Sequence, residues 1–225
     1  MTALEKQAYA GLLRFMIGVA AAMFVAAWTI DYWQAWLFLT VFFGSSFETI
    51  RYLAEHDPKL LERRITAGPA AEKERSQKLI QVLTMIAFFA MLLFPAIDRR
   101  YGWSSMPPYV AVTGDMLVAA GFVAIFFVFK ENSYASSIIE IGAGQKIVTT
   151  GPYAIVRHPM YGGAIVMLIG VPLALGSWWG LLTVIPSTVL IVWRLLEEEK
   201  FLIKNLPGYS QYQNKVRFRL LPSVW

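Results

Sequence analysis

The chain has 225 residues, of which 57% are hydrophobic and only 16% are charged. Soluble domains carry about 25% charged residues, so this composition, with a mean hydropathy of +0.51, indicates an integral membrane protein. The absence of cysteine and the presence of only two histidines exclude disulfides, thiolate nucleophiles and the usual cysteine or multi-histidine metal sites.

Apolar runs predict six helical spans, at residues 11–30, 34–53, 79–97, 109–130, 160–176 and 178–195. A bilayer core needs roughly 20 helical residues, so the last two spans are short, and one or both would be tilted or cross incompletely. The expected fold class is therefore an all-α integral membrane protein with about five to six transmembrane helices and a C-terminal helical hairpin. Residues 1–7 are polar, and no small-residue cleavage site follows a short apolar core. We therefore expect the first span to remain in the protein rather than to be removed as a signal peptide.

Six crossings would place both termini on one side of the membrane, together with the loops 54–78 and 131–159. Of the 20 Lys and Arg, all but Arg99 and Arg100 lie on that side or in helix ends that face it. The positive-inside rule makes that side cytoplasmic. Topology and membrane phosphates account for the basic residues, so nucleic acid is not an expected partner.

Two charged regions near the second span have open roles. Glu48 and Arg51 lie near its cytoplasmic end and are either a structural pair or part of a functional site. The loop 54–78 has mixed charges around a Gly68-Pro69 break, which favours an interfacial or solvated helical segment lying on the lipid headgroups.

The stretch 151–161, Gly-Pro-Tyr-Ala-Ile-Val-Arg-His-Pro-Met-Tyr, is the most informative part of the sequence. Its Gly-Pro pair predicts a turn, and Pro159 suits the first turn of a helix, whose free N–H groups favour an anionic ligand. Tyr153 and Tyr161 can pack against a purine, or against a sulfonium through cation–π attraction. Each residue alone also fits an interfacial or helix-capping role, but the cluster as a whole favours a binding site.

A second polar cluster, Arg-Leu-Leu-Glu-Glu-Glu at 194–199, follows the apolar hairpin. Arg194 and Glu198 are four residues apart and share a helix face, which also fits a simple ion pair where the helix leaves the membrane. Because a hairpin returns to the face from which it started, we expect the two clusters to form one site at the cytoplasmic surface.

Together the two clusters resemble those of the isoprenylcysteine carboxyl methyltransferase family of integral membrane enzymes, and more distantly those of the phospholipid N-methyltransferases. The matching pieces are Gly-Pro-Tyr and Arg-His-Pro-x-Tyr at 151–161, the apolar helix-turn-helix, and Arg-x-x-x-Glu-Glu at 194–199. Leu-Pro-Gly-Tyr-x-x-Tyr at 206–212 and Val-Arg-Phe-Arg-Leu-Leu-Pro at 216–222 complete the pattern. The resemblance covers roughly residues 130–225, and the Leu-Pro-Gly-Tyr form with a short basic C-terminus is typical of bacterial members.

The resemblance implies methyl transfer from S-adenosyl-L-methionine to a lipophilic acceptor that enters from the bilayer, in an enzyme of the bacterial inner membrane. The chain would then be a single membrane domain, 1–225, with N-terminal helices at 1–108 and a methyltransferase core at 109–225. By this analogy Arg194 and Glu198 are catalytic, and Arg194 faces the acceptor. The implied cofactor-binding residues are Lys146, Ile147, Val148, Tyr153, His158, Pro159, Met160, Tyr161, Glu198 and Glu199.

The acceptor is inferred from the chemistry of the transfer. A carboxylate is ionised at neutral pH and needs no base, but it needs a cation in an apolar site, which Arg194 can supply. An amine headgroup would instead need a base such as Glu198 or His158, and a thiol is a further alternative. We therefore expect a carboxylate acceptor, and we expect Arg194→Ala and Glu198→Ala each to abolish turnover in a folded protein.

Two functions from other classes remain open at this stage: a small-solute membrane transporter and a non-catalytic scaffold. The charges gather at one face rather than at mid-membrane, and no repeated half is visible in the sequence, which disfavours a transporter. Binding of S-adenosylhomocysteine would separate the enzyme from both alternatives.

Overall fold

The computed structural model describes residues 1–66, 72, 75–139, 141–142 and 144–225. Within these ranges the elements are all helical, which confirms the expected all-α fold. In chain order they are α1 (Ala3–Ala27), α2 (Trp33–His56), α3 (Pro58–Ile65), α4 (Arg75–Tyr101), α5 (Pro108–Glu131), the 3-10 helix η1 (Gly151–Ala154), α6 (Pro159–Ala174), the 3-10 helix η2 (Trp179–Thr183), α7 (Val184–Asn205) and α8 (Tyr209–Lys215).

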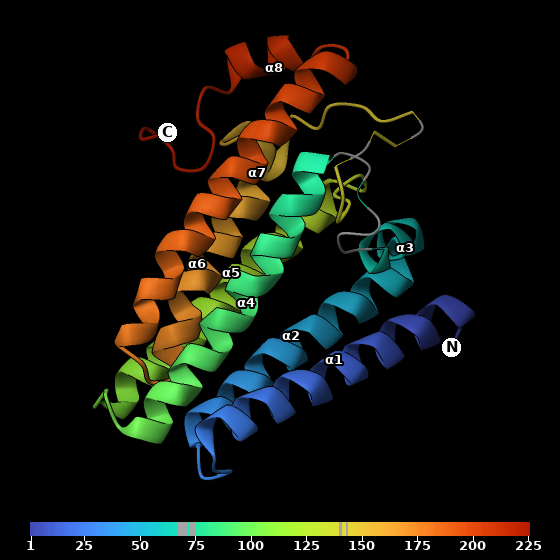
Figure 1. The fold of residues 1–225 in the computed structure, drawn as a ribbon. Coiled ribbons are helices and arrows are strands. Elements are labelled where there is room, and N and C mark those ends of the chain that lie inside the picture. The colour runs from blue at the N-terminus through green and yellow to red at the C-terminus, as the bar shows by residue number, and fades with distance from the viewer. Residues whose placement is uncertain (67–71, 73–74, 140, 143) are drawn as a thin grey trace.

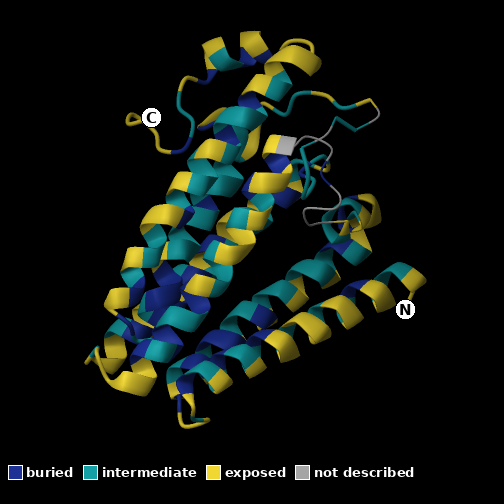
Figure 2. Ribbon diagram, in the orientation of Figure 1, coloured by how far each residue is buried: buried dark blue, intermediate teal, exposed yellow. Residues whose placement is uncertain are grey.

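Helices α4 to α7 lie side by side as a bundle, and α1 and α2 form a hairpin inclined to it (Figure 1). The turns α1–α2, α4–α5 and α6–α7 gather at one end of the molecule. Both termini, α3, α8 and the described parts of the segment 132–158 lie towards the other end. This arrangement agrees with the predicted even number of crossings. Buried residues concentrate where the helices meet, whereas the outward face of α1 is largely exposed (Figure 2).

Among the described residues, four helices are long and apolar enough to cross a membrane: Ala3–Ala27, Ser76–Tyr101, Pro108–Glu131 and Trp179–Asn205. Helix α2, which contains the predicted span 34–53, is not one of them. Helix α6 is apolar but has only 16 residues, as expected for a short span. Helix α7 with the preceding η2 extends over 27 residues, well beyond the predicted span 178–195. The protein is thus an integral membrane protein whose C-terminal hairpin pairs a short helix with a long one.

The third helix continues past its proline, because Pro95 lies within α4, which ends only at Tyr101. A proline inside a membrane helix is tolerated where neighbouring groups compensate for the missing N–H. The helix therefore reaches Asp98, which is 1% exposed and accepts hydrogen bonds from the backbone N–H and hydroxyl of Ser104 and from the hydroxyl of Ser177. Asp98 thereby ties α4 to the α6–α7 turn at the end opposite the termini.

Glycines bring α5 and α6 close together. A Cβ built on Gly114 would lie 2.1 Å from the backbone nitrogen of Ala174. One built on Gly163 would lie 2.9 Å from the Ile125 side chain, and one on Gly121 would lie 2.7 Å from the carbonyl oxygen of Gly163. Small residues allow such close packing of membrane helices. This contact fixes the position of α6, whose first turn carries much of the site.

The loop 54–78 is not simply a solvated segment, as the sequence had suggested. Leu60 and Leu61 of α3 are buried, and the side chain of Glu72 is only 1% exposed. The physical reason is tertiary, since Glu72 is paired with an arginine of α7. The predicted break at Gly68-Pro69 lies outside the described residues.

Glu48 and Arg51 form an ion pair of 2.6 Å with side chains that are 60% and 57% exposed. The structure therefore supports the structural interpretation of this pair. Neither residue lines the cavity described below.

Candidate active site

A cavity of about 420 Å³ lies at the end of the bundle near the termini, where α6 begins and α7 ends. Its walls come from α3, α4, the segment 132–148, η1, α6, α7 and α8. A volume of this size is within the usual range of roughly 300–1,000 Å³ for small-molecule sites. Polar and aromatic groups line one part of the cavity, and apolar residues of α6 and α7 (Leu168, Leu190 and Ile191) line another.

The segment before α6 is shaped by its sequence and then held by the C-terminal tail. Gly151 has φ of 56°, a left-handed conformation that glycine adopts without strain. The backbone N–H groups of Arg157 and His158 donate to the carbonyl oxygens of Phe218 and Arg219, both at 2.9 Å. The tail thus holds the segment 151–158 against the start of α6.

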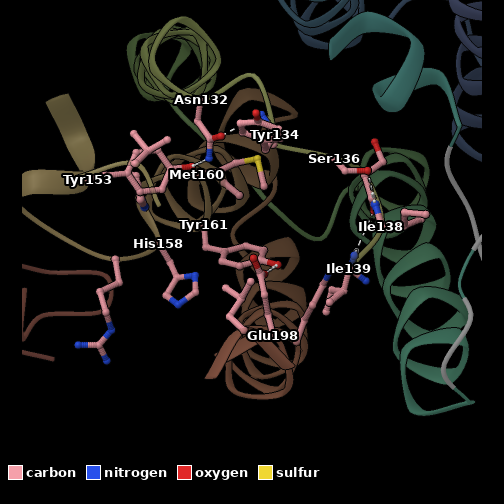
Figure 3. Close-up of a pocket in the computed structure, with 18 of the residues that line it drawn as sticks. Asn132, Tyr134, Ser136, Ile138, Ile139, Tyr153, His158, Met160, Tyr161 and Glu198 are labelled. Carbon is pink, nitrogen blue, oxygen red and sulfur yellow. Dashed lines mark hydrogen bonds between the residues drawn. The ribbon is translucent and has the colours of Figure 1, made fainter. Parts of the chain in front are cut away.

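The two predicted clusters meet in the cavity. The hydroxyl of Tyr161, in the first turn of α6, donates to the carboxylate of Glu198 on α7 at 2.6 Å, and Figure 3 shows the two side chains in contact near the centre of the cavity. His158 lines the cavity beside Tyr161, with ring centroids 5.8 Å apart. Residues 37 positions apart therefore form one constellation, as the hairpin argument predicted.

Glu199 lies outside the cavity lining, although the resemblance implied a cofactor contact. Its carboxylate accepts from Arg157 Nε at 2.7 Å and from Arg219 Nε at 2.9 Å, and lies 3.3 Å from His158 Nε2. Successive helix residues point about 100° apart, and here Glu198 faces the cavity while Glu199 points towards Arg157 and Arg219. Glu199 instead anchors the segment before α6 and the C-terminal tail to α7.

Arg194 pairs with Glu72, not with Glu198 four residues further along the same helix. Its Nη2 donates to Glu72 Oε1 at 2.9 Å and to the carbonyl oxygen of Ser137 at 3.1 Å. Its Nη1 is buried without a hydrogen-bond partner among the described residues. Arg194 lines the cavity, so one donor remains for a ligand while its charge is largely matched by Glu72.

The other residues implied by the resemblance are placed around the same cavity. Lys146, Ile147, Val148, Tyr153, Pro159 and Met160 all line it. The hydroxyl of Tyr153 accepts from the side-chain amide of Asn132 at 2.8 Å (Figure 3). Burial raises the pKa of Tyr153 to about 12, so this phenol stays neutral at physiological pH and can donate to a ligand.

Several lining residues were not identified from the sequence. They are Arg64 from α3, Asn132, the segment 134–139, and Tyr209 and Tyr212 of α8. The sequence also did not identify Glu72, which does not line the cavity but forms an ion pair with Arg194. Tyr209 and Tyr212 belong to the Leu-Pro-Gly-Tyr-x-x-Tyr piece of the resemblance, which could have suggested them. Arg64 and Glu72 carry no local signal, because they reach the site only through the tertiary fold.

The helices across the membrane and the polar cavity at one end define a membrane protein with a site for a small molecule. Two comparisons identify the chemistry. Residues 109–207 match the model of the phospholipid methyltransferase family. Over 195 residues the chain is 27% identical to a probable protein-S-isoprenylcysteine O-methyltransferase of Oryza sativa subsp. indica, covering 81% of this chain and 93% of that protein. The corresponding protein of Oryza sativa subsp. japonica gives the same values.

The chain is therefore an integral membrane methyltransferase. Its similarity to the phospholipid methyltransferase family and to isoprenylcysteine methyltransferases supports the resemblance seen in its sequence. The matched region contains η1, α6, α7 and Glu198, and hence most of the cavity.

Proposed function

We propose that this protein transfers a methyl group from S-adenosylmethionine to a carboxylate on a lipophilic acceptor that reaches the cavity from the bilayer. The proposal rests on the hydrogen bond between Tyr161 and Glu198 inside one cavity. One part of the cavity wall is aromatic and polar, and another part is apolar. The first part suits a polar, cationic cofactor, and the second suits a hydrocarbon chain.

The residues present fit the cofactor. Its adenine and sulfonium would be accommodated by tyrosine rings, which attract cations, and Tyr153, Tyr161, Tyr209 and Tyr212 all line the cavity. The Glu198 carboxylate offers acceptor oxygens for an ammonium or hydroxyl group. The unpartnered Nη1 of Arg194 is a buried donor that a ligand would satisfy, and such groups are rarely left unpaired in proteins.

When bound, S-adenosylmethionine would supply an activated methyl group on a positively charged sulfur, and transfer to an ionised carboxylate would need no external base or oxidant. The main task of this chain's residues is to hold the two reactants in line, which can contribute several kcal/mol to lowering the barrier. Tyr161 fixes the Glu198 carboxylate through its 2.6 Å hydrogen bond, and Glu72 and Ser137 fix the Arg194 guanidinium.

The acceptor carboxylate is supported by two considerations. Arginine side chains, Arg64 and Arg194, line the cavity, and a carboxylate in an apolar site needs a cationic partner. The two rice relatives are named as probable protein-S-isoprenylcysteine O-methyltransferases, and this name specifies oxygen as the methylated atom. A second candidate, N-methylation of an amine headgroup, is favoured by the phospholipid methyltransferase match.

The test uses the purified protein in detergent or nanodiscs. We expect calorimetry to show binding of S-adenosylhomocysteine, and labelled methyl to pass from the cofactor into a membrane lipid extract. A base-labile methyl ester in the product supports the carboxylate acceptor, whereas a base-stable methylamine supports the second candidate. Absence of cofactor binding, with folding verified by circular dichroism, would overturn the proposed function.

A further inference from the structure

Arg64, in the last turn of α3, lines the cavity without a strong protein partner. Its guanidinium stacks on the Phe129 ring at 4.8 Å. Its Nη1 lies 3.4 Å from the carbonyl oxygens of both Ala135 and Ser136, and 3.9 Å from the sulfur of Met160. Good N–H···O hydrogen bonds are about 2.7–3.2 Å long, so these contacts are weak. No other hydrogen bond of the Arg64 side chain occurs among the described residues.

The charge of Arg64 is also unmatched in the part of the chain that the structure describes. Arg194 is paired with Glu72, and Arg157 with Glu199, but no carboxylate there lies within ion-pair distance of Arg64. Burial, and then the nearby positive charge of Arg194, lower the pKa of Arg64 to about 10. The side chain is therefore still protonated at neutral pH, at a free-energy cost that a bound anion would offset.

The position of Arg64 fits a ligand between two arginines. Its guanidinium is close enough to that of Arg194 for the two charges to repel, and both residues line the cavity together with Tyr161. An anion placed between two cations relieves their repulsion and can accept hydrogen bonds from both. Arg194 has one free donor for this purpose, Nη1, whereas Arg64 has nearly its whole guanidinium.

The charges around the cavity add to the argument. The described cations of the site are Arg64, Lys146, Arg157 and Arg194, and its described carboxylates are Glu72, Glu198 and Glu199, so the site carries one excess positive charge. S-Adenosylmethionine with a protonated amino group carries a net charge of +1, and an ionised carboxylic acid carries −1. The two reactants together add no net charge, whereas an ammonium acceptor would add a second positive charge to a partly buried cavity that is already positive.

We propose that Arg64 is the residue that binds the carboxylate of the methyl acceptor and selects it over neutral or cationic headgroups. Arg194, held by Glu72, contributes its single free donor from the other side. This assignment rests on the proposed methyltransferase function and names the residue that determines its acceptor class.

The experiment compares Arg64→Gln with Arg63→Gln, a matched change one position away. Arg63 donates to the carbonyl oxygen of Ser133 at 2.8 Å and stacks on Tyr134, and it does not line the cavity. The probes are an N-acetylated S-prenylcysteine and its carboxamide, which differ only in the charge of the head group. The affinity of the protein for each of these two probes is measured by displacement. Its affinity for S-adenosylhomocysteine is measured separately by calorimetry.

In the wild type we expect the acid to bind about tenfold to a hundredfold more tightly than the amide, the range for a hydrogen bond to a charged group. Arg64→Gln should remove most of this preference and leave the affinity for S-adenosylhomocysteine unchanged. Arg63→Gln should retain both. Arg64→Lys keeps the positive charge but not the planar guanidinium, so it should keep part of the preference for the acid over the amide. This variant tests the role of Arg64 if Arg64→Gln does not fold.

The outcomes separate this proposal from the function on which it rests. A wild type that binds no S-adenosylhomocysteine overturns the methyltransferase proposal itself. Three results leave that function intact and overturn the role of Arg64: a wild type without preference for the acid, an Arg64→Gln variant that retains the preference, or one that loses cofactor affinity. The last result would instead assign Arg64 to the carboxylate of the cofactor.

Discussion

At the scale of single residues, neighbouring glutamates on α7 have three different environments. Glu197 pairs with Lys200 on the surface at 2.6 Å, Glu198 lines the cavity, and Glu199 is buried in an ion cluster. The helical rotation of about 100° per residue produces this separation. A run of three identical side chains thus serves a surface pair, a site and an anchor.

Glu198→Gln tests the site position against its neighbour. The amide keeps the size of the carboxylate but removes its charge, so we expect affinity for S-adenosylhomocysteine to fall about tenfold or more, the loss typical of a charge-assisted hydrogen bond. Glu197→Gln removes only an exposed pair, worth about 0.2–1 kcal/mol in stability, and should leave binding unchanged. Calorimetry on both variants makes the comparison, and equal affinities would remove Glu198 from the site.

The sequence-based expectation for Arg194→Ala changes with the structure. Removing this side chain leaves Glu72 buried without its cation, and an uncompensated buried charge is strongly destabilising. Loss of activity in that variant would therefore combine a direct effect with loss of structure. Glu198 is the more informative position because its hydrogen-bond partner, Tyr161, is neutral.

At the scale of elements, the site depends on how closely α6 approaches α5. Gly114 lies against the backbone of Leu173 and Ala174, near the end of α6, while the other end of the same helix begins at His158 and Pro159. A shift at one end of a short helix moves the other, because the helix is rigid along its axis. The glycines therefore position the active site without touching it.

A pair of glycine substitutions checks this packing. Gly114→Ala places a methyl group 2.1 Å from a backbone nitrogen, so we expect a loss of roughly 1–3 kcal/mol or more from overpacking. Gly18→Ala is the same change in α1, where nothing lies within 4 Å of the new Cβ, and it should be neutral or stabilising because alanine favours helix. Thermal unfolding in detergent measures both, and equal melting temperatures would contradict the close contact.

At the scale of the whole molecule, the fold places the cavity at the end of the bundle that also holds the termini. Basic residues are concentrated at this end, whereas Arg99 and Arg100 lie in the last turn of α4 at the other. The positive-inside rule predicts from this distribution that the cavity faces the cytoplasm. That orientation is a prediction from charge and geometry together.

Single cysteines can test the orientation, since the chain has none of its own. Ser105→Cys lies in the α4–α5 turn and Ser210→Cys in α8, and both positions are exposed. In intact cells, we expect a membrane-impermeant maleimide to label Ser105→Cys and to reach Ser210→Cys only after the membrane is opened. The reverse pattern would invert the topology, and labelling of both in intact cells would contradict the three crossings, α5, α6 and α7, that separate the two positions.

The class of fold and the convergence of the two polar clusters could be predicted from the amino-acid sequence. Helical spans follow from runs of apolar residues, because a backbone in lipid must satisfy its hydrogen bonds internally. The meeting of the clusters at 151–161 and 194–199 follows from the hairpin between them. Both rest on local rules of length and periodicity, which a sequence carries explicitly.

The pairing of the charged side chains, in contrast, depends on the three-dimensional fold. Arg194 selects Glu72 over Glu198, Glu199 serves the C-terminal tail, and Arg64 enters the cavity from α3. The strength of an ion pair depends on the distance between the charges and on their burial in the folded protein. Glu72 and Arg194 are 122 positions apart in the chain, so no local sequence pattern indicates that they pair. The pairing of buried charges therefore had to be read from the folded molecule.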